Sequence, residues 1–540
     1  MNSGGIDEPD ELKELAEELG KGRLYALCVY GSKVAGYARP ESDYDLIVVL
    51  DGFREGIRYK YVDEPVTVSA ILVDKKAMES DAKSARLGEF VVGRLLNVYE
   101  PLVNPEFFRR LEVEYKTRVI EEEVYRIVSE YGELAKELLI HIDYFLFSRL
   151  KSRSGFYPPA LYSYVMTYGG PLKERNLKAT RSGFVKAADR LVEMGLLERD
   201  GDYVRILEAE RSSWIKALSI HTKMTVRSIT HYLVHGYAGR VKPSVVVREL
   251  ASKLGRSAQI GEVPRELKNP KCLWKLTYGE LITGEEWVKE LAKLLGFDEY
   301  EVKEEGPKEF YSTTTLLTLK GGGREERLVV KRFRDPMSLK WLALNIWALA
   351  SKKFDLTPLA RLKREYMALK AFRELGICTK ELVAVDLEDR ILVSRYMEGR
   401  DLGSVVKGIL SGAEEGLELV ERYGELMAKI HSSCYYLGDS KPSNVIIHDD
   451  RLCIVDLEQA GRGGDKAWDI AEFLYYSMKL TLNSKSASSL VKAFLKGYLK
   501  LGSKELVRKV TGVKYVRPFE PFVSPNILAS VVRTIKEETE

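Results

Sequence analysis

Apolar and polar positions in the first 150 residues alternate between strand-like and helix-like spacing. Residues 10–20 have the apolar spacing of a short amphipathic helix, and runs rich in Leu, Val and Ile at 24–30, 46–50 and 66–73 predict strands. Residues 106–150 keep helical spacing over a much longer stretch. We therefore expect a small sheet that is followed by a long helical region.

The pattern changes after this helical region. "TRSGFVKAADRLVEMGLL" predicts a helix, and two short strands joined at Asp200 and Gly201 predict a hairpin after it. A helix followed by a hairpin is the order found in winged-helix domains. Arg181, Lys186 and Arg190 lie on this helix and either contact RNA or DNA phosphates or form a solvated face on a domain that packs against protein.

The second half of the chain begins a new alternation. "FYSTTTLLTL", a GGG turn and "RLVVKRF" predict a strand hairpin, after a mixed helical stretch in which we interpret His231 and His235 as structural, because no HExxH pattern is present. The expected fold class is α+β with several domains. These are a sheet domain (1–108), a helical linker (109–154), a winged-helix domain (155–210), a helical connector (211–290) and a bilobal C-terminal half (291–540).

Composition narrows the classes of protein that fit. The net charge of +4 gives no whole-chain reason to expect nucleic-acid binding. The five cysteines show no CxxC spacing, so we expect free thiols in a reducing cytoplasm, with neither a disulfide framework nor a zinc site. The start of the chain is acidic and unlike a signal peptide, and the longest apolar run, 341–350, is too short for a membrane span. Glutamine occurs only at Gln259 and Gln459, a bias typical of thermophiles.

The stretch "GSKVAGYARPESDYDL" carries the first candidate chemistry. Asp43 and Asp45 are two residues apart, so in an extended chain both carboxylates point to one face. Two adjacent carboxylates repel each other unless a cation lies between them, which favours Mg²⁺ or Mn²⁺. Gly31 and Ser32 come just before them, where a tight turn presents N–H groups and a hydroxyl to a phosphate.

This stretch resembles the minimal nucleotidyltransferases of the DNA polymerase β superfamily. The resemblance implies that Gly31 and Ser32 hold a nucleotide and that Asp43 and Asp45 bind metal. The family carries a third acid on a following strand, but the inward positions of 66–73 carry none; Asp74 ends that strand, and Asp63 and Glu64 precede it. Two readings stay open: a binding domain that has lost catalysis, or an active transferase with a displaced acid.

A second motif, "YLGDSKPSNVIIHDDRLCIVDLEQA", has the spacing of a phosphoryl-transfer site. Such a site needs a base beside the attacking hydroxyl and oxygen ligands for Mg²⁺. Asp439 is the candidate base, and Lys441 is placed to neutralise charge on the transferred group. Asn444 and Asp456 are the candidate metal ligands.

Further parts of a kinase precede this motif in the expected order. Lys331 ends a strand, where a lysine contacts the α- and β-phosphates of ATP, and Glu365 on the next helix is its candidate partner, with Glu374 as an alternative. A nucleotide loop is expected near 304–312. The hinge that meets adenine is expected at Tyr396, Met397 and Glu398.

This half resembles the atypical kinases: RIO kinases, the KEOPS-complex kinase and aminoglycoside phosphotransferases. Asp469 matches the aspartate that starts a helix in that group, whereas Leu437 replaces the usual histidine and Leu457-Glu458 replaces Phe-Gly. Lys441, followed by proline, favours protein kinases over aminoglycoside enzymes.

The sequence therefore predicts an ATP-dependent atypical Ser/Thr kinase, with a protein substrate, fused to a nucleotidyltransferase-fold domain of open activity. Two alternatives remain: a kinase with a small-molecule or nucleotide acceptor, or a nucleic-acid-binding scaffold that ATP switches, as in RIO-like ATPases. The expected cofactor is Mg²⁺ or Mn²⁺, with ATP as substrate.

Overall fold

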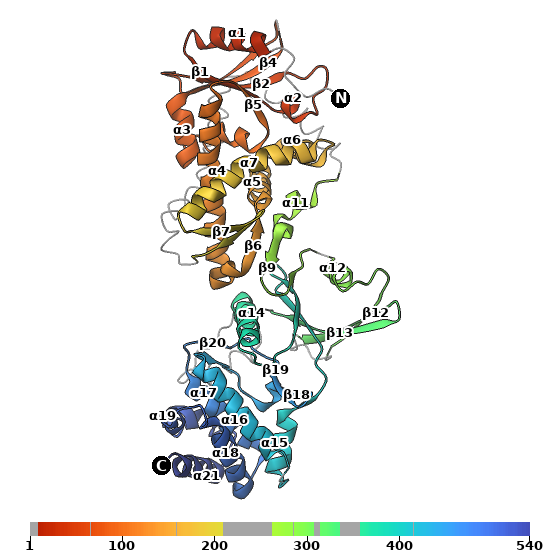
Figure 1. Cartoon of the computed structure of the whole chain (residues 1–540), viewed down its shortest axis with the longest axis vertical. Helices are drawn as coiled ribbons and strands as arrows, with labels where there is room; N and C mark the ends of the chain where they lie inside the picture. The colour runs from red at the N-terminus through yellow and green to blue at the C-terminus, as the bar shows by residue number, and fades with distance from the viewer. Residues whose placement is uncertain are drawn as a thin grey trace. The chain divides into compact units, whose positions relative to one another are not determined.

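A computed structural model describes residues 9–64, 66–157, 159–208, 262–284, 286–306, 314–334, 357–413 and 415–540. The chain divides into unit 1, Met1–Thr277, and unit 2, Tyr278–Glu540, each with its own helices and sheets (Figure 1). The fold is mixed α/β with several sheets. Among the described residues, every helix is too short or too polar to cross a membrane.

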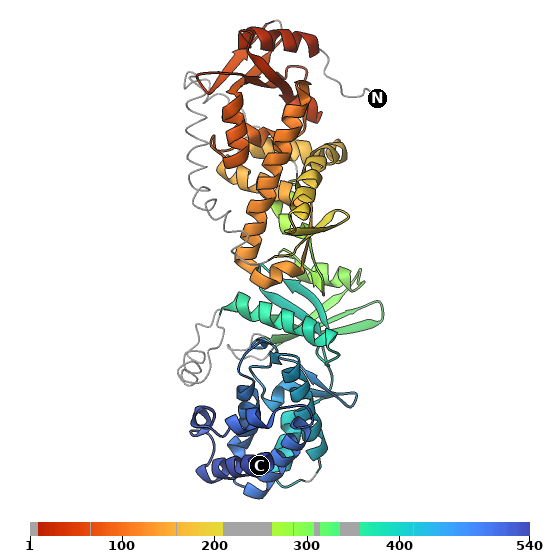
Figure 2. The ribbon, with the colours of Figure 1, turned by 60° about the vertical axis from the view of Figure 1, so that its left-hand side comes forward.

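The first part of unit 1 is a five-stranded sheet with helices on both faces. The elements of unit 1 are α1 Pro9–Gly20, β1 Leu24–Tyr30, α2 Ser32–Ala35, β2 Tyr44–Leu50, β3 Ile57–Val62, β4 Val68–Asp74, α3 Lys75–Ser84, η1 Val92–Leu96, β5 Tyr99–Val103, α4 Pro105–Tyr131, η2 Gly132–Glu137, β6 Leu138–His141, α5 Asp143–Phe156, α6 Pro159–Gly169, α7 Lys173–Glu193, β7 Leu197–Asp200, β8 Tyr203–Ile206, α11 Arg265–Lys268, η4 Pro270–Leu273 and β9 Trp274–Leu276. The sheet order is β3-β4-β2-β1-β5, with α1 on one face and α3 and α4 on the other (Figures 1 and 2).

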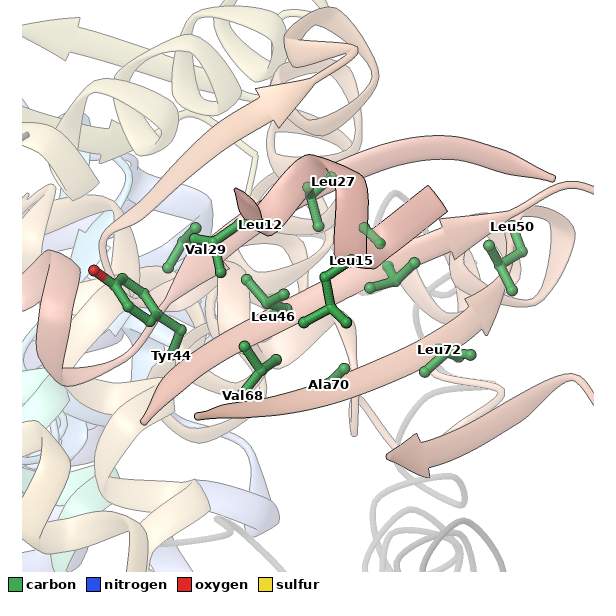
Figure 3. Packing of buried hydrophobic residues seen from close by; sticks show 12 residues of the cluster. Leu12, Leu15, Leu27, Val29, Tyr44, Leu46, Leu50, Val68, Ala70 and Leu72 are labelled. Atoms are coloured by element: carbon green, nitrogen blue, oxygen red, sulfur yellow. The ribbon is translucent and has the colours of Figure 1, made fainter. Parts of the chain in front are cut away.

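Alternation along the strands decides which residues face α1. Tyr44, Leu46 and Leu50 of β2 pack with Leu12 and Leu15 of α1 in one buried cluster, together with alternate residues of β1 and β4 (Figure 3). Because successive side chains of a strand point to opposite faces, the odd-numbered positions of β2 face away from α1. The sheet face opposite to α1 is therefore the one that receives the predicted carboxylates.

The long helix expected over 106–150 is interrupted. α4 ends where Gly132 adopts a positive φ of 56°, and β6 follows after one 3₁₀ segment. The apolar run 138–142 was interpreted as helix, but β6 pairs with β8 and β9 in a sheet of order β7-β8-β6-β9. Short apolar runs do not distinguish a buried strand from a helix by spacing alone.

The helix and hairpin expected after the linker are present as α7 and β7–β8. Arg181, for which phosphate contact and a solvated face were the two alternatives, donates from Nε to Asp143 Oδ1 at 2.8 Å and from Nη2 to Oδ2 at 2.5 Å. Lys186 and Arg190 of α7 are exposed. The residues 209–261, which include both connector histidines, lie outside the described part of the chain.

Unit 2 has a six-stranded sheet followed by a mainly helical part. Its elements are β10 Glu280–Leu281, α12 Trp287–Leu294, β11 Glu301–Glu305, β12 Thr314–Gly321, β13 Arg324–Arg332, α14 Pro358–Glu374, β14 Leu382–Asp386, β15 Ile391–Arg395, β16 Arg400–Asp401, α15 Leu402–Leu410, α16 Leu417–Ser432, β17 Tyr435–Tyr436, η5 Pro442–Asn444, β18 Val445–His448, β19 Arg451–Ile454, β20 Gly461–Arg462, α17 Lys466–Ser477, η6 Met478–Leu480, α18 Ser484–Tyr498, α19 Lys504–Lys509, α20 Val513–Val516, η7 Arg517–Phe519 and α21 Pro525–Thr539. The large sheet has the order β10-β14-β15-β13-β12-β11. Most of the loop expected at 304–312 lies outside the described residues.

The expectation of free thiols is wrong for two cysteines. Cys378 and Cys453 form a disulfide across 75 residues, beside a backbone hydrogen bond of 2.9 Å from Ile454 N–H to the Cys378 carbonyl. Cysteine spacing carried no signal for this pair, because the tertiary fold brings the segment before β14 against β19. Cys28 and Cys434 keep free thiols.

Candidate functional site

The predicted lysine of unit 2 lies at the centre of a buried ionic cluster. Leu328 and Val330 of β13 pack in the core on the α12 side of the sheet, so Lys331 points to the opposite face. Its Nζ lies 2.8 Å from Glu365 Oε2 on α14, 2.8 Å from Asp456 Oδ1 and 3.0 Å from Glu458 Oε2. The structure thus brings the lysine together with its expected helix partner and with the predicted metal ligand Asp456.

Further charges complete this cluster. Lys380 Nζ donates to Glu365 Oε1, and Arg361 Nη2 donates to Glu458 Oε2 at 2.7 Å. Three carboxylates therefore face three basic groups, which is the pairing that buried charges need. Burial alone raises the pKa of Asp456, but Lys331, with help from Lys380, lowers it to about 2. Burial lowers the pKa of Lys331, but Asp456, Glu365 and Glu458 together raise it well above its usual value.

The loop between β17 and η5 carries the predicted base. The Lys441 ammonium lies 2.9 Å from Asp439 Oδ1, and Asn444 Nδ2 donates to the Asp439 carbonyl at 3.1 Å. Val455 N–H donates to the Asn444 carbonyl at 3.0 Å, which holds Asn444 beside the start of the Asp456 segment. Burial lowers the pKa of Lys441, but the Asp439 and Glu472 carboxylates together raise it above its usual value, so the ammonium stays charged.

Asp469 at the start of α17 fixes the backbone of this loop. Its carboxylate accepts from Leu437 N–H at 2.6 Å, from Gly438 N–H at 2.8 Å and from His431 Nε2 at 3.1 Å. His431 comes from α16 and is anchored through Nδ1 by the Tyr498 hydroxyl at 2.8 Å. A histidine therefore supports the loop from another helix, although Leu437 replaces the loop histidine.

The predicted hinge follows β15. Tyr396 N–H donates to the Arg327 carbonyl at 2.9 Å, and the Arg327 guanidinium lies 4.0 Å from the centre of the Tyr396 ring. His448 Nδ1 hydrogen-bonds to the Glu398 carbonyl at 2.7 Å. Met397, between them, is half-buried. The segment is thus tied to β13 and to β18 at its two ends.

In unit 1, the predicted turn and carboxylates meet at one end of the sheet. Tyr30 of β1 pairs with Asp45 of β2, so Gly31 directly follows the partner of the carboxylate. Gly31 has a φ of 81°, and a Cβ there would lie 2.1 Å from Asp45 Oδ2, so glycine is required on both counts. Ser32 begins α2, and Asp43 directly precedes β2.

The three further acids lie at different places around this site. Ser69 of β4 is the residue beside Asp45, and Asp74 ends the same strand, where it accepts from Phe53, Lys76 and Ala77 N–H groups. Five residues of strand separate Ser69 from Asp74, about 16 Å. Asp63 follows β3 at the same end as Asp43. Burial raises the pKa of the Tyr61 hydroxyl, and the Asp63 and Asp43 carboxylates raise it further.

Known proteins match parts of this chain. Residues 10–128 match the family described as "Nucleotidyltransferase domain". The chain is 28% identical over 158 residues to the "Probable bifunctional tRNA threonylcarbamoyladenosine biosynthesis protein" of Methanosarcina mazei, which is 28% of this chain and 26% of that protein. It is 27% identical over 93 residues to the "KEOPS complex subunit Bud32" of Pyrococcus abyssi, which is 17% of this chain and 41% of that subunit.

Residues 10–128 thus form a nucleotidyltransferase domain, and the similarity to the two curated proteins supports its fusion with a RIO/KEOPS-like kinase domain. The chain spans about a quarter of the length of the first curated relatives it matches. The solved structure "WaaP in complex with acyl carrier protein" is 14% identical, with a TM-score of 0.28, and the match covers 46% of this chain and 93% of that one. At the level of families, both parts of the fusion resemble transferases.

Several residues of the kinase-like domain escaped the sequence prediction. Lys380 and Arg361 lie outside any motif, and only the fold brings them to Glu365 and Glu458. In the sequence, Glu458 stood out only as part of the Leu-Glu pair that replaces Phe-Gly, and it was assigned no role in the site. His431 lies eight residues before Asp439 at the end of a helix, a spacing that carries no local signal.

The nucleotidyltransferase domain has its own missed residue, Arg94 on η1. Its Cζ lies 5.5 Å from the ring centre of Tyr30 and 5.6 Å from that of Phe90, and Nη2 donates to the Tyr59 hydroxyl at 3.4 Å. Burial alone lowers the pKa of Arg94, but Tyr30, Tyr59 and Asp45 raise it more. An isolated arginine between two apolar runs gave no signal in the sequence.

Proposed function

We propose that the C-terminal half is an ATP-dependent atypical kinase that phosphorylates a Ser or Thr hydroxyl of a protein. The observation that carries this proposal is the contact of Lys331 with both Glu365 and Asp456, each at 2.8 Å. These residues come from β13, α14 and the segment after β19, and phosphoryl transfer needs a lysine, its partner and a metal ligand at one place.

Each predicted site residue of the C-terminal half has a role in this phosphoryl transfer. Asp439 accepts the proton of the attacking hydroxyl, and Lys441 neutralises charge on the transferred group. Lys331 contacts the phosphates, and Glu365 positions Lys331. The hinge residues Tyr396, Met397 and Glu398 contact the adenine ring of ATP.

The donor set fits a divalent ion. Asp456 stays ionised at neutral pH, because Lys331 holds its pKa at about 2. The side chain of Asn444 is fixed through Nδ2, which leaves the side-chain oxygen Oδ1 as the ligand atom. Carboxylate and amide oxygens are the ligands that Mg²⁺ and Mn²⁺ prefer. Such an ion, when bound, neutralises the phosphates of ATP.

The nucleotidyltransferase domain is included in the proposal as a nucleotide-binding site. Asp43 and Asp45 supply oxygen ligands for a divalent ion, and Gly31 and Ser32 lie against the nucleotide. The missing Cβ of Gly31 supports this, because it lets the Asp45 carboxylate lie directly against the turn that precedes Ser32. The similarity to a subunit of the KEOPS complex supports a protein partner, and the exposed Lys186 and Arg190 support nucleic-acid contact more weakly.

The test uses ATP labelled at the γ- or at the α-phosphate, with the full chain and a mixture of candidate proteins. We expect label from the γ-position on protein, and a loss of about 100-fold or more in Asp439→Asn and Asp456→Asn. Asp450→Asn is the matched control, because Asp450 lies on the exposed β18–β19 turn. Equal γ-transfer in all three variants refutes the assignment, whereas labelling of metabolites alone favours a small-molecule kinase.

A further inference from the structure

Arg94 lies beside the nucleotidyltransferase site and has no part in the proposed function. Tyr30 and Asp45 are directly paired across β1 and β2, so their side chains lie on the same face of the sheet. The guanidinium covers the Tyr30 ring at 5.5 Å, and Tyr59, its hydrogen-bond partner, stands on β3 of the same sheet. A fixed positive charge therefore lies on the carboxylate face.

Acidic groups on this face are few. Ser69, not an acid, is beside Asp45 on β4. Within the described residues, the only three acidic groups that close to within 4.8 Å of one another are Glu365, Asp456 and Glu458 of unit 2. Asp43 and Asp45 therefore form no such group with Asp63, and the charges of these two carboxylates and of Arg94 add up to about −1.

Arg94 also has an unused donor. Its Nε is buried and has no hydrogen-bond partner. Buried donors are nearly always satisfied, and leaving one unsatisfied costs free energy. Nε itself is covered by protein, so a bound phosphate would meet the outer nitrogens of the guanidinium, whose planar arrangement suits phosphate.

We propose that Arg94 is a built-in cation of this site, which positions a nucleoside triphosphate so that a single divalent ion, held by Asp43 and Asp45, suffices. This inference rests on the proposed nucleotide site. Arg94 supplies the positive charge that a second ion would otherwise bring. Since two-ion sites use the second ion to activate the attacking group, the domain binds nucleotide without fast nucleotidyl transfer.

The test counts Mn²⁺ by electron paramagnetic resonance in the full chain, with Asp456→Asn to weaken the kinase site and α,β-methylene ATP as the probe. We expect Asp45→Ala to remove one Mn²⁺ per chain. Arg94→Met should weaken binding of the probe by about tenfold or more, with Arg94→Lys intermediate. Arg58→Met, on the outer strand β3 and paired with Glu55, is the control.

A gain-of-function variant keeps the test independent of folding defects. Ser69→Asp combined with Arg94→Met should bind one Mn²⁺ more than the parent, and thermal unfolding reports whether each variant is folded. Removal of two Mn²⁺ by Asp45→Ala, one of them also removed by Asp63→Asn, overturns the inference while the nucleotide site stands. Removal of none overturns the nucleotide site itself, and the inference with it.

Discussion

Asp45 of unit 1 and Asp456 of unit 2 each lie near a cation of the protein, but the two cations are held differently. Lys331 contacts three carboxylates, so it can leave Asp456 for a phosphate while Glu365 and Glu458 still balance its charge. Arg94 is packed on two aromatic rings and bonded to a tyrosine. A flexible ammonium among several anions suits exchange of partners, whereas a stacked guanidinium suits a fixed charge.

The largest expected effect tests the exchangeable lysine. Lys331→Ala should lower γ-phosphate transfer by about 100-fold, because the phosphates lose their anchor. Lys331→Arg should also lose most activity, since a planar guanidinium does not replace a compact ammonium at this position. Lys320→Ala is the control, as Lys320 pairs with Glu325 on the surface. Nucleotide binding by unit 1 should persist in every variant; if it disappears with Lys331, the two sites are not independent.

Two substitutions of Glu365 test its role in positioning Lys331 and its role in the stability of the fold. Glu365→Gln should reduce transfer less than Lys331→Ala does, because Lys331 keeps Asp456 and Glu458 as partners. Glu365→Ala leaves the buried Lys380 ammonium without the carboxylate that it contacts and should cost about 3–5 kcal/mol of unfolding free energy. Urea unfolding of both variants measures this. Wild-type stability of Glu365→Ala would contradict the buried ionic cluster.

The Cys378–Cys453 disulfide lies in unit 2, and we expect it to stabilise that unit and not unit 1. Cys453 lies three residues before Asp456, and the bond to Cys378 closes a loop of 75 residues, so its removal should cost unit 2 about 4 kcal/mol or less. Unfolding of Cys378→Ala with Cys453→Ala, with and without reductant, checks this. Cys434→Ala, which removes an exposed free thiol, should be silent. A drop confined to unit 1 would show that the cross-link does not stabilise unit 2.

The smallest effect is the pH dependence of Asp456. Its pKa is about 2 in the folded chain against 3.8 ordinarily, so its contribution to stability is present above pH 3.8 and is lost as pH falls toward 2. The stability difference between the wild type and Asp456→Asn should therefore shrink between pH 4 and 2. A difference that stays constant over this range would mean that Lys331 does not hold the carboxylate ionised.

The motifs with fixed spacing were the most predictable parts. The Asp43–Asp45 pair, the loop from Asp439 to Asn444 and the pairing of Lys331 with Glu365 involve residue types that one strand, one loop or one strand–helix unit brings together. Strand 24–30 and helix 10–20 followed from apolar spacing, and both are present as β1 and α1. β6 was missed because a four-residue apolar run between helices takes its conformation from the strands β8 and β9 beside it.

The sequence by itself determined the order of the elements that carry each motif, because local spacing sets which residues share a strand face or a turn. Only the tertiary structure decided which charges surround those motifs. Arg94, Lys380, His431 and the Cys378–Cys453 bond come from segments with no local signal, and they reach their partners through sheet register and helix packing. Buried charges need partners wherever the fold provides them, so their pairing depends on long-range contacts that no short stretch of sequence encodes.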